Sequence, residues 1–145
     1  MEKVKIRSMH DVDYSGKTVL LRLNINSPID SDTKRIVNEN RIKKSLPTLN
    51  YLLDSGAKVA IIAHQGDTLD YQNLISMAEH AEKLAALSGR PVRYIDDVCG
   101  PAALEAVRTL KPGEAVLLGN LRYLTEEISH FELVVQQTPA EMTGC

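Results

Sequence analysis

The sequence predicts an α/β domain with a doubly wound, mostly parallel sheet and helices on both faces, a three-layer Rossmann-like architecture. Four short apolar runs, beginning near residues 18, 58, 91 and 115, alternate with segments whose apolar residues recur at helical spacing. The connections are short, which favours right-handed crossovers and places helices on both faces. A chain of 145 residues suits one core, so we expect a single domain over residues 1–145.

Composition and charge narrow the class of protein. Charged residues make up 25% of the chain and hydrophobic residues 43%, as in an ordinary soluble globular protein. The formal net charge is −2 and the basic residues are dispersed, which argues against general nucleic-acid binding. No apolar run approaches the ~20 residues that span a bilayer, and the N-terminus lacks the apolar core of a signal peptide. We therefore expect a cytoplasmic protein with no membrane partner.

The spacing of cysteines and histidines gives no signal for a disulfide framework or a metal site. The two cysteines, Cys99 and Cys145, form no C-x-x-C pair. The four histidines share no metal-ligand spacing. We expect no metal in this chain.

The run 18–28 predicts the first long strand, after a short edge strand at residues 3–6. Val19, Leu21, Leu23 and Ile25 alternate with Leu20, Arg22, Asn24 and Asn26. We interpret most of this run as a strand that is buried on both faces, as in a parallel sheet. Pro28 ends the strand because it has no N–H to donate. Asn24 and Asn26 therefore lie at its carboxyl end, where ligands bind in open parallel sheets. The alternative is that the two amides make only turn hydrogen bonds.

The next segment predicts a helix that begins after residue 38 and stops at Gly56. Asn38 or Asn40 can cap it, and Pro47 lies inside it, where a kink is expected. Arg41 falls in the first turn, where the helix dipole disfavours a positive charge. A guanidinium there can grip a carboxylate or phosphate in two places. The alternative is an ordinary solvated arginine.

The run 58–64 predicts the second buried strand, with His64 at its carboxyl end. This residue belongs to the same sheet edge as Asn26, although a histidine at such a position can also be purely structural. A helix is expected from Thr68, as its cap, to Gly89. Its charged side chains at positions 79, 82 and 83 are expected to form the solvated face.

A short strand at 91–95 and a helix from about residue 101 follow. Asp96 and Asp97 between them invite an acid/base or metal interpretation, but Asp97 is also well placed to cap the helix after Gly100. Cys99 is expected to be an inert thiol. The apolar face of this helix is predicted to carry residues 104, 107 and 110.

The run 115–118 predicts the fourth buried strand, which continues into Gly119 and Arg122. The last stretch, 124–135, has the spacing of an amphipathic helix, and another helix could open at 138–141. Because the carboxyl ends of parallel strands meet at one edge, the candidate side chains are expected to converge there. They form an anion-binding cluster with these members: Asn24, Asn26, His64 and Arg122, with Arg41 reaching over from its helix.

Five motifs in order resemble the phosphoglycerate kinase family. They are LRLNINSP, ENRI, AHQG, DDVCGP and KPGEAVLLGNLRY, against family patterns close to RVDFNVP, TDDTRI, SHLGRP or the archaeal AHQGRP, DDCIGPEV and LLENLRF. The resemblance implies the N-terminal domain that binds 3-phosphoglycerate, here incomplete. The family transfers a phosphoryl group between 1,3-bisphosphoglycerate and ADP with magnesium.

The resemblance also implies roles for the candidate residues. Arg41 would contact the acid substrate and help to neutralise the transferring phosphoryl group, and the other four would orient the substrate. Mg-ATP or Mg-ADP is expected only in the complete two-domain protein, with no cofactor in this chain. The partners implied are a small anionic substrate and a missing C-terminal nucleotide domain, and the isolated chain is expected to be inactive.

Three motif positions depart from the family pattern. Asn24 replaces an aspartate, Asp67 replaces an arginine, and Gly119 replaces a glutamate. One hypothesis is therefore a phosphoglycerate kinase polypeptide with an adjusted acid site, in which Asp67 pairs with Arg41 or Arg122 and weakens anion binding. A second is a non-catalytic binding or regulatory relative. A third is a generic α/β domain, which does not explain the order of the motifs.

Overall fold

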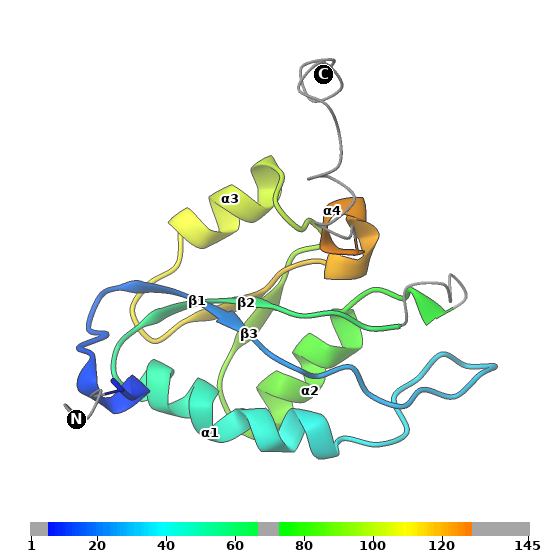
Figure 1. Cartoon of the computed structure of the whole chain (residues 1–145), viewed down its shortest axis with the longest axis horizontal. Helices are drawn as coiled ribbons and strands as arrows, with labels where there is room; N and C mark the ends of the chain where they lie inside the picture. Colours follow the sequence, from blue (N-terminus) through cyan, green and yellow to red (C-terminus); the bar gives the residue numbers. More distant parts are fainter. Residues whose placement is uncertain (1–5, 67–72, 129–145) are drawn as a thin grey trace, which may run out of the picture.

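The computed structural model describes residues 6–66 and 73–128, which form a parallel sheet with helices on both faces (Figure 1). The strands, in sheet order, are β1 (Thr18–Arg22), β2 (Lys58–Ile62), β4 (Ala115–Leu117) and β3 (Val92–Tyr94). The longer helices are α1 (Asn40–Asp54), α2 (Ala78–Ser88) and α3 (Pro101–Arg108). Every neighbouring pair of strands is parallel. The predicted α/β class with helices on both faces is confirmed.

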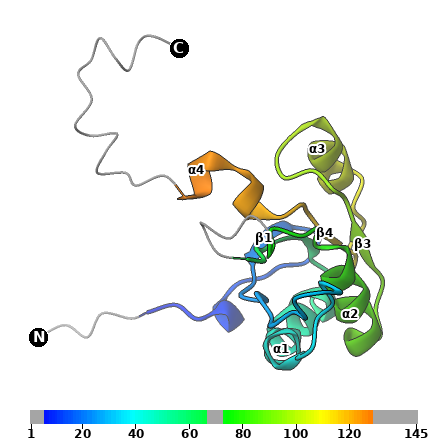
Figure 2. The ribbon, with the colours of Figure 1, turned by 90° about the vertical axis from the view of Figure 1, so that its right-hand side faces the viewer.

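The two faces of the sheet carry separate apolar clusters, with α1 and α2 on one side and α3 on the other (Figure 2). Val59 and Ile61 of β2 point into the larger cluster under α1 and α2. Ala60, between them, points into the smaller cluster with Ala103 and Ala106 of α3. This alternation is the period of a strand, and it explains why β2 and β4 consist almost entirely of buried apolar residues.

The first strand is an edge strand, and the prediction that it is buried on both faces is wrong. Among the described residues β1 pairs only with β2. Val19 and Leu21 pack against the larger cluster, whereas Leu20 on the other face is 67% exposed. The strand is half-covered because α3 lies over the middle of the sheet and leaves this face of β1 open.

Helix α1 has the predicted extent and apolar face, but its cap differs from the prediction. Its N-cap residue is Glu39, which makes no side-chain capping bond, while Asn38 Oδ1 accepts the Asn40 N–H at 2.9 Å. Pro47 lies in the interior, and the helix continues through it as one element. Gly56 ends it with a left-handed φ of +76°, which glycine adopts without strain. The buried positions are Ile42, Leu49, Leu52 and Leu53.

Helix α2 begins later than predicted, at Ala78, and its charged residues are not simply a solvated face. Glu79 Oε2 accepts the Ile36 N–H at 3.1 Å, and Glu79 also pairs with Lys83 at 3.8 Å. Lys83 Nζ lies 2.7 Å from Glu39 Oε1, just before α1. These contacts bury much of Glu79 and Lys83 because the segment before α1 packs on this side of α2, whereas Glu82 is exposed as predicted.

Helix α3 begins where the sequence predicts, but its inward face differs. Asp97 Oδ1 accepts the Gly100 N–H and Oδ2 accepts the Ala103 N–H, each at 2.9 Å. These bonds lower the pKa of Asp97, the one to Ala103 most. Asp97 is therefore a helix-capping residue. Of the predicted apolar face, Leu110 is buried and Val107 packs against the smaller cluster. Leu104 is 52% exposed, because the small Ala103 and Ala106 face the sheet instead.

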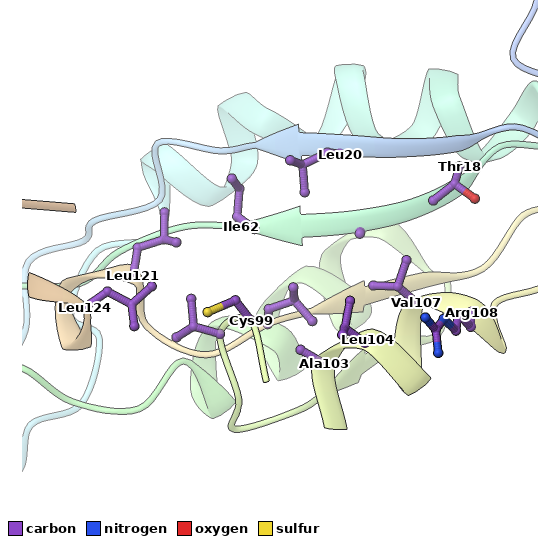
Figure 3. Close-up of a pocket in the computed structure, with 13 residues that line it drawn as sticks. Thr18, Leu20, Ile62, Cys99, Ala103, Leu104, Val107, Arg108, Leu121 and Leu124 are labelled. Carbon is purple, nitrogen blue, oxygen red and sulfur yellow. The ribbon is translucent and has the colours of Figure 1, made fainter. Parts of the chain in front are cut away.

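The open face of β1 and the exposed side of α3 line an apolar groove of about 490 Å³ (Figure 3). Leu20 and Ile62 lie on its sheet side, and Leu104 and Val107 lie opposite. Cys99, an exposed free thiol, also lines it.

The described chain closes with η3 (Leu121–Tyr123) and α4 (Thr125–Ile128), which follow β4. Three predictions lie wholly or partly outside the described residues: the strand at 3–6, the helix cap at Thr68 and the helices beyond 128. Within residues 6–66 and 73–128, no helix is long and apolar enough to cross a membrane.

Candidate functional site

The carboxyl ends of three adjacent strands meet at one edge of the sheet. Arg22, the last residue of β1, lies opposite Ile62, the last residue of β2, so the residues that follow leave the sheet at the same level. Asn24 and His64 each come two residues later. Arg122 comes from η3, after β4, which is the other neighbour of β2. The predicted convergence of strand ends is therefore present in the topology.

Asn24 and Arg41 are in direct contact. Arg41 Nη1 donates to Asn24 Oδ1 at 3.3 Å, and both side chains are exposed. The first turn of α1 thus reaches over the end of β1, as the sequence predicted. Arg41 remains accessible to a ligand, while one of its terminal nitrogens is hydrogen-bonded to Asn24.

Asn26 contacts the backbone that follows β2. Its side-chain Oδ1 accepts the Gly66 N–H at 3.3 Å, across 40 positions of sequence. Neither asparagine makes only a local turn bond, which was the alternative left open by the sequence. The pair instead links the end of β1 to α1 and to the loop after His64.

The half-buried imidazole of His64 lies in the field of several charged groups. Burial is the largest of the effects that lower its pKa, followed by the positive charges of Arg122 and Arg22. Glu127 acts in the opposite direction, and Arg41 lowers the pKa further. His64 is therefore neutral at neutral pH. Three guanidinium groups, each from a different element, lower the pKa of this one imidazole.

Arg122 has a buried donor that is not satisfied by the described residues. Within 6–66 and 73–128, its Nε has no hydrogen-bond partner, whereas its backbone N–H donates to Asn120 Oδ1 at 3.0 Å. A buried donor without a partner is unfavourable by about 1–3 kcal/mol. The Arg122 residue as a whole is partly exposed. The positions named so far form the strand-end cluster: Asn24, Asn26, Arg41, His64 and Arg122.

Sequence reasoning missed Arg22 as a neighbour of this cluster. It pairs with Glu127 of α4, through the two terminal nitrogens of the guanidinium. The signal was present, because Arg22 and Asn24 are two apart and side chains at i and i+2 of a strand share a face. Glu127 could not be linked to it from sequence, since the two lie 105 positions apart.

One further prediction concerns a residue near this edge. Asp67, which was predicted to pair with Arg41 or Arg122, lies outside the described residues. The apolar groove of Figure 3 includes no member of the strand-end cluster among its lining residues. The groove and the cluster are therefore separate features of the molecule.

The parallel sheet with polar side chains at its strand ends defines an open-sheet α/β domain of the Rossmann-like class. The family model for phosphoglycerate kinase matches residues 9–142. The chain belongs to the phosphoglycerate kinase family.

Individual relatives agree with this assignment. Phosphoglycerate kinase from Methanothermus fervidus is 41% identical over 124 residues, which cover 86% of this chain and 30% of that protein. The enzyme from Thermococcus kodakarensis is 44% identical over 120 residues, 81% of this chain. The crystal structure of phosphoglycerate kinase from Pyrococcus horikoshii OT3 matches with a TM-score of 0.81 and 36% identity, covering 94% of this chain and 33% of that one. The chain spans about 30% of the length of the curated relatives it matches.

Proposed function

We propose that the strand-end cluster binds the small anionic acid substrate of phosphoglycerate kinase, of the 3-phosphoglycerate class. The observation that carries the proposal is the placement of three arginines at the same strand ends. Arg22 ends β1, Arg41 contacts Asn24, and Arg122 follows β4. The positive charges of all three lower the pKa of His64. Three positive charges gathered at one sheet edge attract a multiply charged anion, and the chain as a whole, with a net charge of −2, offers no such attraction. The affinity is therefore local to this edge.

Each side chain has a role that follows from its chemistry. Arg41 is the catalytic residue of the proposal, because an exposed guanidinium can contact a phosphoryl or carboxylate group in two places. Arg122, which is partly exposed, supplies a second guanidinium charge. Neutral His64 and the amides of Asn24 and Asn26 supply hydrogen bonds without adding charge. Phosphoryl transfer depends mainly on such positioning and charge neutralisation.

The proposed activity of the longer polypeptide is phosphoryl transfer between 1,3-bisphosphoglycerate and ADP. The present chain would supply the acid side, and a nucleotide-binding domain elsewhere in the longer protein would supply the other. By itself the 145-residue chain is proposed to bind without catalysing. A cytoplasmic location belongs to the same proposal.

The described residues do not fit the magnesium ion of a Mg-nucleotide. Within 6–66 and 73–128, no three side chains of His, Cys, Asp or Glu lie together in a way that could hold a metal ion. The guanidinium groups around His64 would also repel a cation. The strand-end cluster is suited to the anionic acid, and no step of the proposal involves the metal.

One observation favours a second candidate function, a non-catalytic binding or regulatory module. Arg22 is already paired with Glu127, and Asn24 is neutral where the family pattern has an aspartate. A site altered in this way could bind another anion, or bind the same one more weakly.

An NMR titration of the 145-residue chain with 3-phosphoglycerate tests the proposal. We expect saturable shifts of the His64 imidazole and of the Asn26 and Arg122 amides, and loss of these shifts in Arg41→Ala. Arg108→Ala is the matched control, since this exposed arginine lies near Thr18, at the opposite end of β1 (Figure 3). No shift in the unmodified chain at millimolar ligand would overturn the proposed function and favour the regulatory module.

A further inference from the structure

A set of buried polar side chains lies at the same strand ends as the proposed anion site. Ser27 follows β1, Gln65 follows β2, Asn120 follows β4, and His80 comes from α2. All four are at most 4% exposed. Buried polar groups are unfavourable unless they find partners, so a cluster of four needs an extensive set of bonds. We call these four residues the buried amide cluster.

Gln65 is the centre of this cluster. Its side-chain Oε1 accepts the Ser27 N–H, and its Nε2 donates to the Ser27 carbonyl, both at 2.9 Å. The side chain thus forms two bonds with the backbone of one residue, as a neighbouring strand would. The segment after β1 is held at a set distance from the segment after β2.

His80 locks the orientation of that amide. Its Nε2 lies 3.0 Å from Gln65 Oε1. Because the Ser27 N–H requires an acceptor, Oε1 must be the oxygen, and His80 Nε2 must carry the proton. Burial lowers the pKa of His80 to about 4, so the imidazole is neutral at neutral pH.

Asn120 holds the backbone of Gln65 from the other side. Its Oδ1 accepts the Gln65 N–H at 3.2 Å and the Arg122 N–H at 3.0 Å. Its Nδ2 donates to the Gln65 carbonyl at 2.9 Å and to the Ile75 carbonyl at 2.8 Å. One amide therefore joins the residue after His64 to the backbone of Arg122.

We propose that Gln65 is a positioning residue for anion binding. Through Ser27 and Asn120 it sets the spacing between the strand ends that carry Asn26, His64 and Arg122. The proposal rests on the proposed function, because it assigns to Gln65 the geometry of that same site. Gln65 itself is buried, so it acts through the backbone of its neighbours.

The placement of Gln65 separates this role from that of an ordinary core residue. Its two sequence neighbours are His64 and Gly66, and the Gly66 N–H donates to Asn26 Oδ1. Loss of the Gln65 amide would therefore displace His64 on one side and the contact between Gly66 and Asn26 on the other. A core residue such as Leu52, buried in the second half of α1, has no such link.

The experiment compares Gln65→Leu with the control Leu52→Ala in the 145-residue chain. We expect Gln65→Leu to raise the Kd for 3-phosphoglycerate at least tenfold and to speed amide exchange of Gly66 and Arg122 at least tenfold. Exchange at the β2 amides should change less. Leu52→Ala should lower the melting temperature while leaving the Kd within twofold. An unchanged Kd in Gln65→Leu overturns the proposal.

The two readouts separate failure of this inference from failure of the proposed function. If the unmodified chain binds no 3-phosphoglycerate, the proposed function fails, and exchange in the free chain decides the inference: unchanged exchange at Gly66 and Arg122 overturns it. If Gln65→Leu does not fold, Gln65→Asn takes its place, since it keeps the amide and shortens its reach by one methylene. The same increases in Kd and exchange are expected, and their absence overturns the inference.

Discussion

The buried amide cluster and the strand-end cluster lie at the same end of the sheet, yet they are held in opposite ways. In the first, Gln65 and Asn120 use both ends of their side-chain amides in bonds of 2.8–3.2 Å. In the second, Arg41 donates one side-chain hydrogen bond, of 3.3 Å, to Asn24 and stays exposed, and Arg122 Nε has no partner within the described residues. The difference indicates that the fully bonded amides determine position, whereas the accessible guanidinium groups are suited to bind an anion.

The largest expected effect is the loss of stability when Asn120, in the buried amide cluster, is truncated. Asn120→Ala removes four hydrogen bonds, two to buried backbone groups of Gln65 and two to partly buried backbone groups of Ile75 and Arg122. We expect the free energy of unfolding to fall by about 4 kcal/mol. Denaturant titration measures it. The matched variant Asn24→Ala, at an exposed amide, should change stability by less than about 0.5 kcal/mol. Equal losses in the two variants would remove the distinction between the clusters.

The second effect is the pH dependence of stability through His80. Because its folded pKa, about 4, lies below the ordinary value of 6.5, the unfolded chain binds the proton more tightly. The contribution is fully present above pH 6.5 and is lost as the pH falls towards 4. It amounts to about 3 kcal/mol. Denaturant unfolding of the unmodified chain and of His80→Leu, each at pH 7 and pH 4, isolates the contribution of His80 to the free energy of unfolding. The variant should lose less stability than the unmodified chain when the pH is lowered. Parallel losses would contradict the neutral, buried state of His80.

A charge-conserving substitution of Arg122 tests the strand-end cluster. Arg122→Lys keeps the positive charge and removes the planar fork together with Nε. We expect about a tenfold weaker affinity for 3-phosphoglycerate, with the free energy of unfolding changed by less than about 0.5 kcal/mol. Isothermal titration calorimetry and denaturant unfolding measure the two quantities. Arg108→Lys on α3 is the control, and a stability loss as large as that of Asn120→Ala would place Arg122 with the structural residues.

The smallest expected effect concerns the ion pair between Arg22 and Glu127. Glu127→Gln frees Arg22 and removes the negative charge that raises the pKa of His64. We expect a further decrease of the His64 pKa and about a twofold to fivefold gain in affinity for 3-phosphoglycerate, since partly exposed charges interact weakly. NMR titration of His64 against pH measures the first quantity. Glu126→Gln is the neighbouring control, and a weaker affinity in Glu127→Gln would mean that the carboxylate assists the site.

The sequence was sufficient for the class of fold and for which residues gather at the strand ends. Alternating apolar runs and helical spacing are local signals, and the rule that parallel strands end at one edge turns them into a site. Arg41 at the start of α1 and its proximity to Asn24 followed from the same reasoning.

The order of strands and the long-range polar contacts could not be predicted in the same way. Burial of β1 on both faces was expected from its composition, but composition does not state that Leu20 lies on an edge strand. Gln65 and Ser27 are 38 positions apart and carry no motif for each other. Glu79 had the periodicity of a solvated helix face, and only the packing of the segment around Ile36 on α2 makes it partly buried.

Gly119 connects one departure from the family pattern to the backbone that precedes α3. A Cβ at this position would lie 3.2 Å from backbone atoms of Asp97, and the Gly119 N–H donates to the Asp97 carbonyl at 3.0 Å. The Asp97 segment also starts α3. A side chain at this position, such as the glutamate of the family pattern, would therefore require the Asp97 segment to shift by a few tenths of an ångström. The absence of a side chain at residue 119 thus lets the end of β4 lie directly against the turn that caps α3.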